Sequence, residues 1–167
     1  MKLTSIFTIL TAAVLSTAAG PPAKTPKIPG ISYLYTVNIT AGETYPVGNG
    51  PHGLRLVVPI TGGTFAGPKL RGTVMPVGGE WGTLDTGHAN GSFYPDVRQT
   101  FKTDDGAYIQ IFESGASQTD GSAHVSLKFD TGSEKYYWLN RAVGFGILNR
   151  LTDTSLTIDA FIVNPPA

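Results

Sequence analysis

The sequence predicts an all-β fold: a single small antiparallel β-barrel, closed or nearly closed. Glycine and proline make up about a fifth of the 167 residues, with 21 Gly and 12 Pro, which indicates many short elements joined by turns. Apolar and polar residues alternate in several windows, and no window shows a convincing 3.6-residue period. With about eight strands, closure into a barrel removes the exposed edges that an open sheet leaves.

Length and composition favour one globular domain. A chain of 167 residues is the size of one domain and is long enough to bury a core. Charged residues make up 14% of the chain and hydrophobic ones 41%, a balance that excludes a disordered protein. The formal net charge is zero and no basic stripe is visible, so we expect no nucleic-acid partner.

Residues 1–19 are typical of a secretory signal peptide. Lys2 precedes an apolar run from Ile6 to Leu15, which is too short to span a bilayer. Small residues fit a cleavage site after Ala18 or Ala19. We therefore expect a secreted, extracellular protein that has no membrane attachment after cleavage; the alternative is an uncleaved anchor.

The mature chain divides into a leader and a barrel domain. Residues 20–30 form a proline-rich leader without a core of its own, and residues 31–164 form the barrel. The chain has no cysteine, so its stability must come from the core and from closure of the sheet, and thiol chemistry is excluded. Two sequons, at Asn38 and Asn90, support export and predict a glycoprotein.

The first predicted strand spans residues 31–40, where apolar and polar side chains alternate. If Asn38 carries a glycan, its face of this strand meets solvent, and the opposite face then points into the barrel. The predicted inward set is Ile31, Tyr33, Tyr35, Val37 and Ile39.

Residues 54–74 predict a buried strand, a glycine-rich bend and a second strand beside the first, after a loop at residues 41–53. Gly62, Gly63 and Gly67 are typical of the bulges and sharp bends at barrel corners. We expect this stretch to shape the wall of any cavity.

Beyond this hairpin the pattern continues as sheet. Asp104, Asp105 and Gly106 predict a tight turn, for which these residue types give a sufficient structural reason, and residues 113–121 predict a polar loop. Pro165 and Pro166 end the last strand. The further strands are predicted at residues 70–77, 80–85, 93–103, 107–112, 122–129, 136–148 and 155–163.

Six motifs in order resemble uncharacterised protein family 0311, also catalogued as domain of unknown function 3237. The resemblance covers roughly residues 31–163 and identifies the chain as a secreted, fungal-type member. It implies a small barrel similar to those of allene oxide cyclase and dirigent proteins, and it implies no assigned reaction. The motifs are Val58-Pro59-Ile60-Thr61-Gly62-Gly63-Thr64-Phe65 with Gly67-Pro68-x-Leu70-x-Gly72-Thr73-Val74, Gly78-Gly79-Glu80-Trp81, Asp96-Val97-Arg98, Thr103-Asp104-Asp105-Gly106-Ala107, Phe129-Asp130-Thr131-Gly132 and Tyr136-Tyr137-Trp138-Leu139-Asn140.

Three residues are candidates for catalysis: Glu80, Asp96 and Arg98. Asp96 and Arg98 share one face of a strand, so Arg98 can keep Asp96 ionised if that face lines the barrel. Glu80, beside Trp81 in an apolar mouth, would have a raised pKa and serve as an acid. The alternative for Asp96 and Arg98 is a surface ion pair, because such pairs are common.

Three further residues are candidates for ligand binding: Trp81, Trp138 and Asn140. On a strand, Trp138 and Asn140 lie on one face and can hold a small aromatic ligand inside the barrel. The alternative is a core tryptophan beside an asparagine that bonds to the backbone.

The sequence predicts no metal and no cofactor. His52, His88 and His124 lie far apart and show no short metal-ligand spacing. No G-x-S-x-G elbow is present, and Gly144-Phe145-Gly146 lies in a predicted strand rather than opening a helix, so serine hydrolase and nicotinamide functions are excluded.

Three functions remain open. The first is a secreted barrel that binds a small apolar or aromatic metabolite and catalyses a cofactor-free acid–base isomerisation, dehydration or cyclisation. The second is a non-catalytic, dirigent-like binding module. The third is an extracellular structural or interaction protein without a cavity. An open cavity with ionisable groups at its base favours the first.

Overall fold

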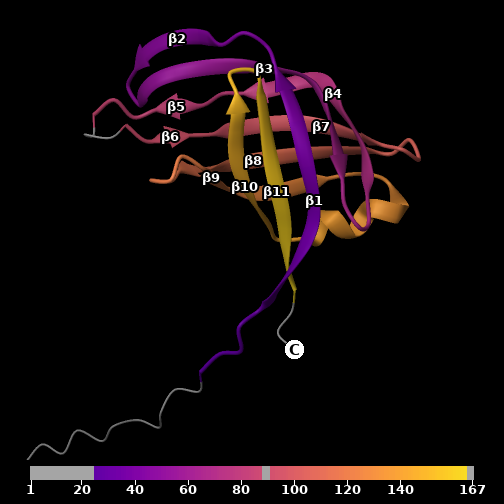
Figure 1. The fold of residues 1–167 in the computed structure, drawn as a ribbon. Coiled ribbons are helices and arrows are strands. Elements are labelled where there is room, and N and C mark those ends of the chain that lie inside the picture. Colours follow the sequence, from indigo (N-terminus) through magenta and orange to yellow (C-terminus); the bar gives the residue numbers. More distant parts are fainter. Residues whose placement is uncertain (1–24, 88–90, 165–167) are drawn as a thin grey trace, which may run out of the picture.

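The computed structural model describes residues 25–87 and 91–164 and has the barrel that the sequence predicts (Figure 1). Eight strands follow one another in the order β1-β11-β10-β9-β8-β7-β4-β3, each antiparallel to its neighbours, and pairing of β1 with β3 closes the ring. The eight strands are β1 (Gly30–Ala41), β3 (Gly53–Ala66), β4 (Arg71–Glu80), β7 (Asp96–Thr103), β8 (Tyr108–Ser117), β9 (Ala123–Asp130), β10 (Gly144–Thr152) and β11 (Ser155–Asn164).

Three short strands extend the sheet beside the first half of β3. They are β2 (Tyr45–Gly50), β5 (Thr83–Leu84) and β6 (Phe93–Tyr94); β2 and β5 pair with β3, and β6 pairs with β5. The loop predicted at residues 41–53 is therefore partly strand. The strand predicted at residues 93–103 is two strands, because Pro95 lies between β6 and β7 and has no backbone N–H to donate.

A bulge in β1 changes which side chains point inward. The pairing of β1 with β11 shifts between Tyr33 and Tyr35, so that Leu34 and Tyr35 are both buried. Ile31 and Tyr33, which were expected inside, are exposed. After the bulge the predicted alternation holds, and Val37 is buried as expected.

Two glycines allow neighbouring strands to approach closely at bulges in β3 and β4. Gly63 has φ 147° and Gly78 has φ 104°, and a side chain at either would overlap a backbone carbonyl, that of Asn38 or that of Arg98. The register of the β3–β4 pair shifts just before Gly63, and that of the β4–β7 pair just before Gly78. The bulge at Gly63 has the character predicted for residues 54–74.

The region before β10 is helical rather than extended. Residues 136–148 were predicted as one strand, but Glu134–Arg141 forms the 3₁₀-helix η1. Its buried residues, Tyr136 and Leu139, are three positions apart, which matches the three-residue turn of this helix and not the period of a strand. In the described part of the chain, no helix is long and apolar enough to cross a membrane.

Residues 113–121 were predicted as a polar loop, but β8 continues through the first part of this segment to Ser117. Glu113 is 2% exposed and pairs with a residue of β7 on one side and of β9 on the other. A carboxyl group is thus buried inside the barrel.

Aromatic rings fill the end of the barrel that lies toward η1. Phe65 and Phe101 stack with ring centroids 4.1 Å apart, and Tyr35 meets Phe101 edge-on at 5.4 Å. Phe129 also packs against Tyr35. These rings fill the interior of the barrel at this end.

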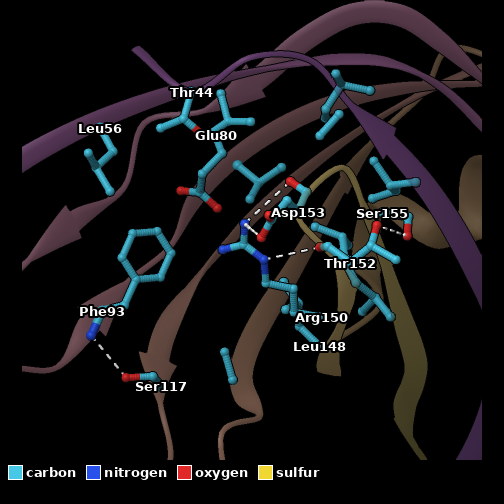
Figure 2. Close-up of a pocket in the computed structure, with 18 of the residues that line it drawn as sticks. Thr44, Leu56, Glu80, Phe93, Ser117, Leu148, Arg150, Thr152, Asp153 and Ser155 are labelled. Carbon is cyan, nitrogen blue, oxygen red and sulfur yellow. Dashed lines mark hydrogen bonds and ion pairs between the residues drawn. The ribbon is translucent and has the colours of Figure 1, made fainter. Parts of the chain in front are cut away.

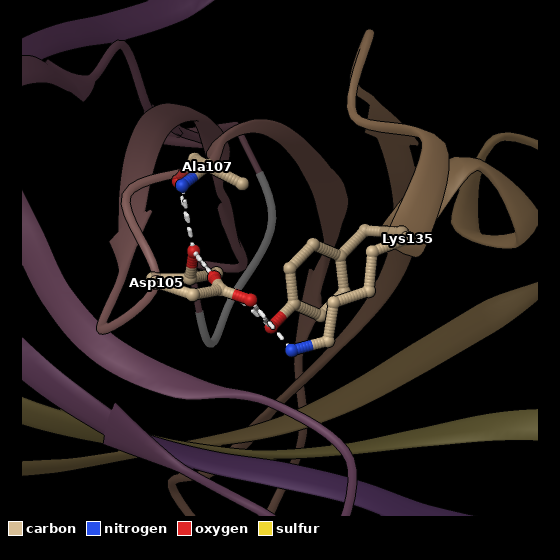
Figure 3. A network of polar contacts seen from close by, with 5 residues as sticks. Asp105, Ala107 and Lys135 are labelled. Carbon is tan, nitrogen blue, oxygen red and sulfur yellow. Dashed lines mark hydrogen bonds and ion pairs between the residues drawn. The ribbon is translucent and has the colours of Figure 1, made fainter.

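A polar network fixes the turn between β7 and β8 to η1 (Figure 3). The Asp105 carboxylate accepts hydrogen bonds from Lys135 Nζ at 2.5 Å, from Tyr136 Oη and from Thr103 Oγ1. These donors hold the pKa of Asp105 at about 2, below its usual value. Gly106 has φ 89°, as the predicted tight turn requires.

Candidate functional site

A pocket of about 420 Å³ opens at the end of the barrel opposite η1, between the turns that join β8 to β9 and β10 to β11 (Figure 2). Its wall is mostly aliphatic, with one acidic side chain on the wall and charged groups at the rim. The predicted role of residues 54–74 in shaping a cavity agrees with the position of β3 in this wall. The lining includes Ile39, Leu56, Val58, Ile60, Glu80, Phe93, Val97, Leu148, Arg150, Thr152, Asp153, Leu156 and Ile158.

Glu80 is the carboxyl group on the wall of this pocket. It ends β4, where it pairs with Val58 on one side and Val97 on the other, and Figure 2 shows its carboxyl near Leu56 and Phe93. Its Oε1 accepts a 2.7 Å hydrogen bond from the Asp96 backbone N–H. Burial raises the pKa of Glu80 to about 7, and the Asp96 charge adds to the rise while the hydrogen bond opposes it. Glu80 therefore retains its proton in much of the protein at neutral pH.

A second carboxyl group, Glu113, is buried below the pocket. Val97 of β7 pairs with both Glu80 and Glu113, so the two carboxyl groups belong to one row across the sheet. Gln99 Nε2 donates a hydrogen bond to Glu113 Oε1. Burial raises the pKa of Glu113 to about 8, and the Glu80 charge adds to the rise. Glu113 is thus protonated at pH 7.

Three buried polar atoms between the pocket and the aromatic rings have no hydrogen-bond partner among the described residues. They are Tyr35 Oη, Gln99 Oε1 and Glu113 Oε2. The sequence contained a signal for the inward position of two of these residues. Gln99 alternates with Val97 and Phe101, and a strand extended through residue 113 would place Glu113 on the inner face.

Asp96 and Arg98 lie on the outer face of β7, opposite Val97 and Gln99. Their side chains form an ion pair at 3.4 Å and are 45% and 48% exposed, which is the surface alternative considered above. The Arg98 guanidinium lies 5.6 Å from the ring centre of Trp81, which is also exposed. None of these three residues lines the pocket, but the backbone and charge of Asp96 act directly on Glu80.

Trp138 and Asn140 lie on η1, at the far end from the pocket, because their segment is helical and not a strand. The Asn140 side chain accepts from the Thr131 N–H and donates to the Thr131 carbonyl, both at 2.8 Å. Trp138 packs against the core and carries Lys69 Nζ over its ring at 5.2 Å. Both contacts match the structural alternative for these two residues.

Arg150 at the pocket rim was not singled out from the sequence. It lies near the end of β10, two residues after Leu148, and both side chains line the pocket. Its Nε donates to the Thr152 carbonyl at 3.1 Å, and its Nη2 contacts the Asp153 carbonyl and carboxylate at 3.3 Å. Nothing in the local sequence marks Arg150, because the rim exists only when the β10–β11 turn meets the other strands.

The structure describes one of the two predicted glycosylation sites. Asn38 is exposed on the outer face of β1, whereas Asn90 and the predicted signal peptide lie outside the described residues. Within residues 25–87 and 91–164, no group of three or more His, Cys, Asp or Glu side chains is arranged to hold a metal ion.

Known proteins resemble this chain in sequence. The hydroalkoxylation enzyme phnH of Penicillium herquei is 34% identical over 146 residues, which cover 87% of this chain and 89% of that protein. A UPF0311 protein of Rhodopseudomonas palustris strain TIE-1 is 25% identical over 138 residues, which cover 72% of this chain and 88% of the relative.

Solved structures share the fold. A β-barrel-like protein from Acinetobacter baumannii superposes with a TM-score of 0.78 at 26% identity, over 85% of this chain and 100% of the other. An enzyme from Penicillium herquei superposes with a TM-score of 0.70 at 30% identity, over 85% and 99%. The model of the family described as protein of unknown function DUF3237 matches residues 29–124, more than half of this sequence. The chain therefore belongs to the DUF3237 family.

Proposed function

We propose that this protein is a cofactor-free acid–base catalyst that adds a hydroxyl group across a carbon–carbon double bond within one small, largely apolar molecule. The observation that carries the proposal is Glu80: a carboxyl group with a raised pKa on the wall of an otherwise apolar pocket. Support comes from the 34% identity to a fungal protein named as a hydroalkoxylation enzyme. The product is an isomer of the substrate, so no oxidant or reductant is needed.

A single carboxyl group can serve for both proton transfers of this reaction. Protonated Glu80 gives its proton to one alkene carbon, which forms a C–H bond and leaves a carbocation at the other carbon. The substrate hydroxyl attacks that carbon, and a C–O bond forms. The hydroxyl proton returns to the Glu80 carboxylate, which restores the acid. The aliphatic wall excludes water that would otherwise capture the cation.

Around this acid, Asp96 and Arg98 act as positioning residues. The Asp96 N–H orients the Glu80 carboxyl, the Asp96 carboxylate raises its pKa, and Arg98 balances the Asp96 charge. Trp81 covers Arg98 on the outer side of the same wall. These roles replace the direct catalytic and ligand contacts expected from the sequence.

The second candidate is a non-catalytic, dirigent-like module that binds the same class of small molecule. The mostly aliphatic lining favours it, since such a wall binds an apolar body without chemistry. The open pocket argues against the third function, a structural protein without a cavity.

We also propose that the chain is a secreted, fungal-type glycoprotein. The identity to the Penicillium relative is higher than that to the Rhodopseudomonas relative, which supports the fungal-type assignment. The exposure of Asn38 supports glycosylation at that residue. Loss of mass on treatment with an N-glycosidase tests this assignment on protein expressed in a fungal host; Asn38→Gln should reduce the loss, and Asn38→Gln combined with Asn90→Gln should abolish it.

The catalytic proposal is tested with ortho-prenylphenol, which carries a hydroxyl group and a trisubstituted double bond whose protonation gives a tertiary cation. In D₂O, we expect an isomeric cyclic ether that carries one non-exchangeable deuterium on carbon. Glu80→Gln should reduce the rate at least about a hundredfold, the usual scale of a general acid. Glu134→Gln, the same change on exposed η1, is the matched control.

The outcomes separate the two candidates. Deuterium incorporation that depends on Glu80 supports catalysis. Binding of the probe without conversion, together with unchanged binding by Glu80→Gln, overturns catalysis and leaves the binding module. Equal rates for the wild type and Glu80→Gln reject Glu80 as the acid.

A further inference from the structure

Arg150 is the cationic side chain that the pocket wall presents at its rim. It lines the pocket together with Leu148, and its side chain is 64% exposed. Figure 2 shows it reaching from β10 across the mouth toward the β10–β11 turn. A cation beside an aliphatic wall is suited to a ligand with an apolar body and an acidic end.

The contacts of the guanidinium leave part of it free. Nε and Nη2 donate to the Thr152 carbonyl and to the Asp153 carbonyl and carboxylate. Nη1 contacts no acceptor among the described residues, and in Figure 2 it is the end of the group without dashed lines, directed into the pocket. The Asp153 contact is long, at 3.3 Å, and the Asp153 side chain is fully exposed, so that ion pair is weak and easily replaced.

Glu80 does not neutralise Arg150. No ion pair joins the two among the described residues, although both line the pocket. A ligand can therefore meet a carboxyl group on the wall and a guanidinium at the rim, at separate points of its own structure.

We propose that Arg150 binds an acidic oxygen of the ligand, a phenolate, enolate or carboxylate, and so selects aromatic or enolic molecules for the pocket. The assignment rests on the proposed function for its consequence in catalysis. Planar Nη1 and Nη2 donors match a carboxylate or an enolate oxygen, and charge-assisted hydrogen bonds are stronger than neutral ones. Leu148 and Leu156 would hold the apolar body beside them.

Bound in this way, the substrate oxygen becomes a better nucleophile. Arg150 favours the ionised form of a phenol or enol and lowers its pKa. The proton that this oxygen loses on ionisation goes to solvent, and the Glu80 carboxylate regains a proton from solvent after giving its own to the alkene carbon. One charged residue thus activates the nucleophile while the neutral acid activates the double bond.

The test measures binding alone. Isothermal titration of the full chain compares naphthalene carboxylate with its methyl ester, two probes with the same apolar body and different charge. We expect the carboxylate to bind about tenfold tighter or more, with a preference that falls as salt rises. Arg150→Gln should remove the preference and leave the affinity for the ester unchanged, and Arg150→Lys should retain part of it. Lys102→Gln, on the outer face of β7, is the control.

Equal affinity of the wild type for acid and ester, or a preference that survives Arg150→Gln, overturns the assignment. The result is independent of turnover, because neither naphthalene probe carries both the hydroxyl group and the alkene that the proposed reaction consumes. Deuterium incorporation without that preference would retain the catalytic proposal and reject Arg150. The preference without incorporation would retain Arg150 as a binding residue and reject catalysis. Thermal melting of both Arg150 variants checks that they remain folded.

Discussion

Glu80 and Glu113 reach the interior from β4 and β8, and Val97 of the intervening strand pairs with both. Their environments differ: Glu80 borders the pocket, whereas Glu113 is buried beneath it with Gln99. Burial raises the pKa of both groups, that of Glu80 to about 7 and that of Glu113 to about 8. Two carboxyl groups in unequal environments are an arrangement found at acid–base sites.

The pH profile of turnover should show Glu80 acting as an acid. With a pKa of about 7, Glu80 is protonated below neutral pH and loses its proton above it. Activity on ortho-prenylphenol should therefore be level below pH 7 and fall about tenfold per pH unit above it. Initial rates from pH 5 to 9 measure this. A rate that increases through pH 7 would mean that Glu80 works as a base.

Glu113→Gln should flatten the pH dependence of stability. The pKa of Glu113 is about 8 when folded against an ordinary 4.5, so the folded state holds a proton that the unfolded state has lost between these values. The stability from this group is complete below pH 4.5 and declines as pH rises to about 8. Urea unfolding of the wild type should show this decline, and Glu113→Gln should lack it.

An amide at position 113 can form a poorer hydrogen bond with Gln99 than the carboxyl group does, and this alone would lower the free energy of unfolding. The comparison therefore uses the slope of the unfolding free energy against pH and not its absolute value. Glu134→Gln, on exposed η1, should keep the wild-type slope. The same slope in Glu113→Gln would show that Glu113 is not protonated in the folded protein.

Asp96→Asn should shift the catalytic profile toward lower pH. The Asp96 carboxylate raises the pKa of Glu80, while its backbone N–H remains available in the variant. Because Asp96 is 45% exposed, the shift should be a few tenths of a pH unit, and the stability should change by less than about 1 kcal/mol. Arg98→Gln should shift the profile the other way, since it leaves the Asp96 charge unbalanced. Shifts of the same sign in both variants would contradict this account.

Asp105→Asn should reduce stability at neutral pH and remove one source of acid denaturation. The folded pKa of Asp105 is about 2 against an ordinary 3.8, so its contribution is present above pH 3.8 and is lost as pH falls toward 2. Thermal midpoints at pH 6 and pH 2 measure the effect: the wild type and the variant should differ at pH 6 and converge at pH 2. Asp104→Asn is the control, because the Asp104 side chain makes no hydrogen bond with other described residues.

Gly82→Ala should narrow the pocket. A methyl group at position 82 would overlap the Phe93 ring and lie 3.0 Å from Glu80 Oε1, so the ring must shift, and both side chains line the pocket. We expect weaker binding of naphthalene carboxylate by calorimetry. Gly132→Ala, where a methyl group meets nothing within 4 Å, should bind as the wild type does. Equal binding by Gly82→Ala would show that Phe93 does not limit the pocket.

Local patterns account for the strands that were predicted correctly. Alternation in residues 31–40 and 122–129, and the turn residues Asp104 to Gly106, depend on the chain within a few positions. The wrong predictions concern segments whose conformation depends on contacts with distant parts of the chain. Residues 136–148 contain good strand formers, yet packing of Tyr136 and Leu139 against the core requires a 3₁₀ turn.

The candidate site shows the same division. The sequence predicts a raised pKa for Glu80 beside Trp81 if that mouth is apolar, whereas it places Glu113 in a polar loop at residues 113–121. Pairing of β8 with β7 on one side and with β9 on the other keeps Glu113 in a strand and turns it inward. Likewise, the outer pairing of Asp96 with Arg98 is set by which face of β7 packs on the core.

By itself, the sequence determined that this chain is all-β, since period-two alternation, abundant glycine and proline and the lack of a helical period act locally; it left open whether the barrel is closed or nearly closed. The tertiary structure alone decided which polar groups share the interior. Glu80 and Glu113 share the interior and Arg150 stands at the rim above them, because strand register and ring closure join three strands that are distant in the chain.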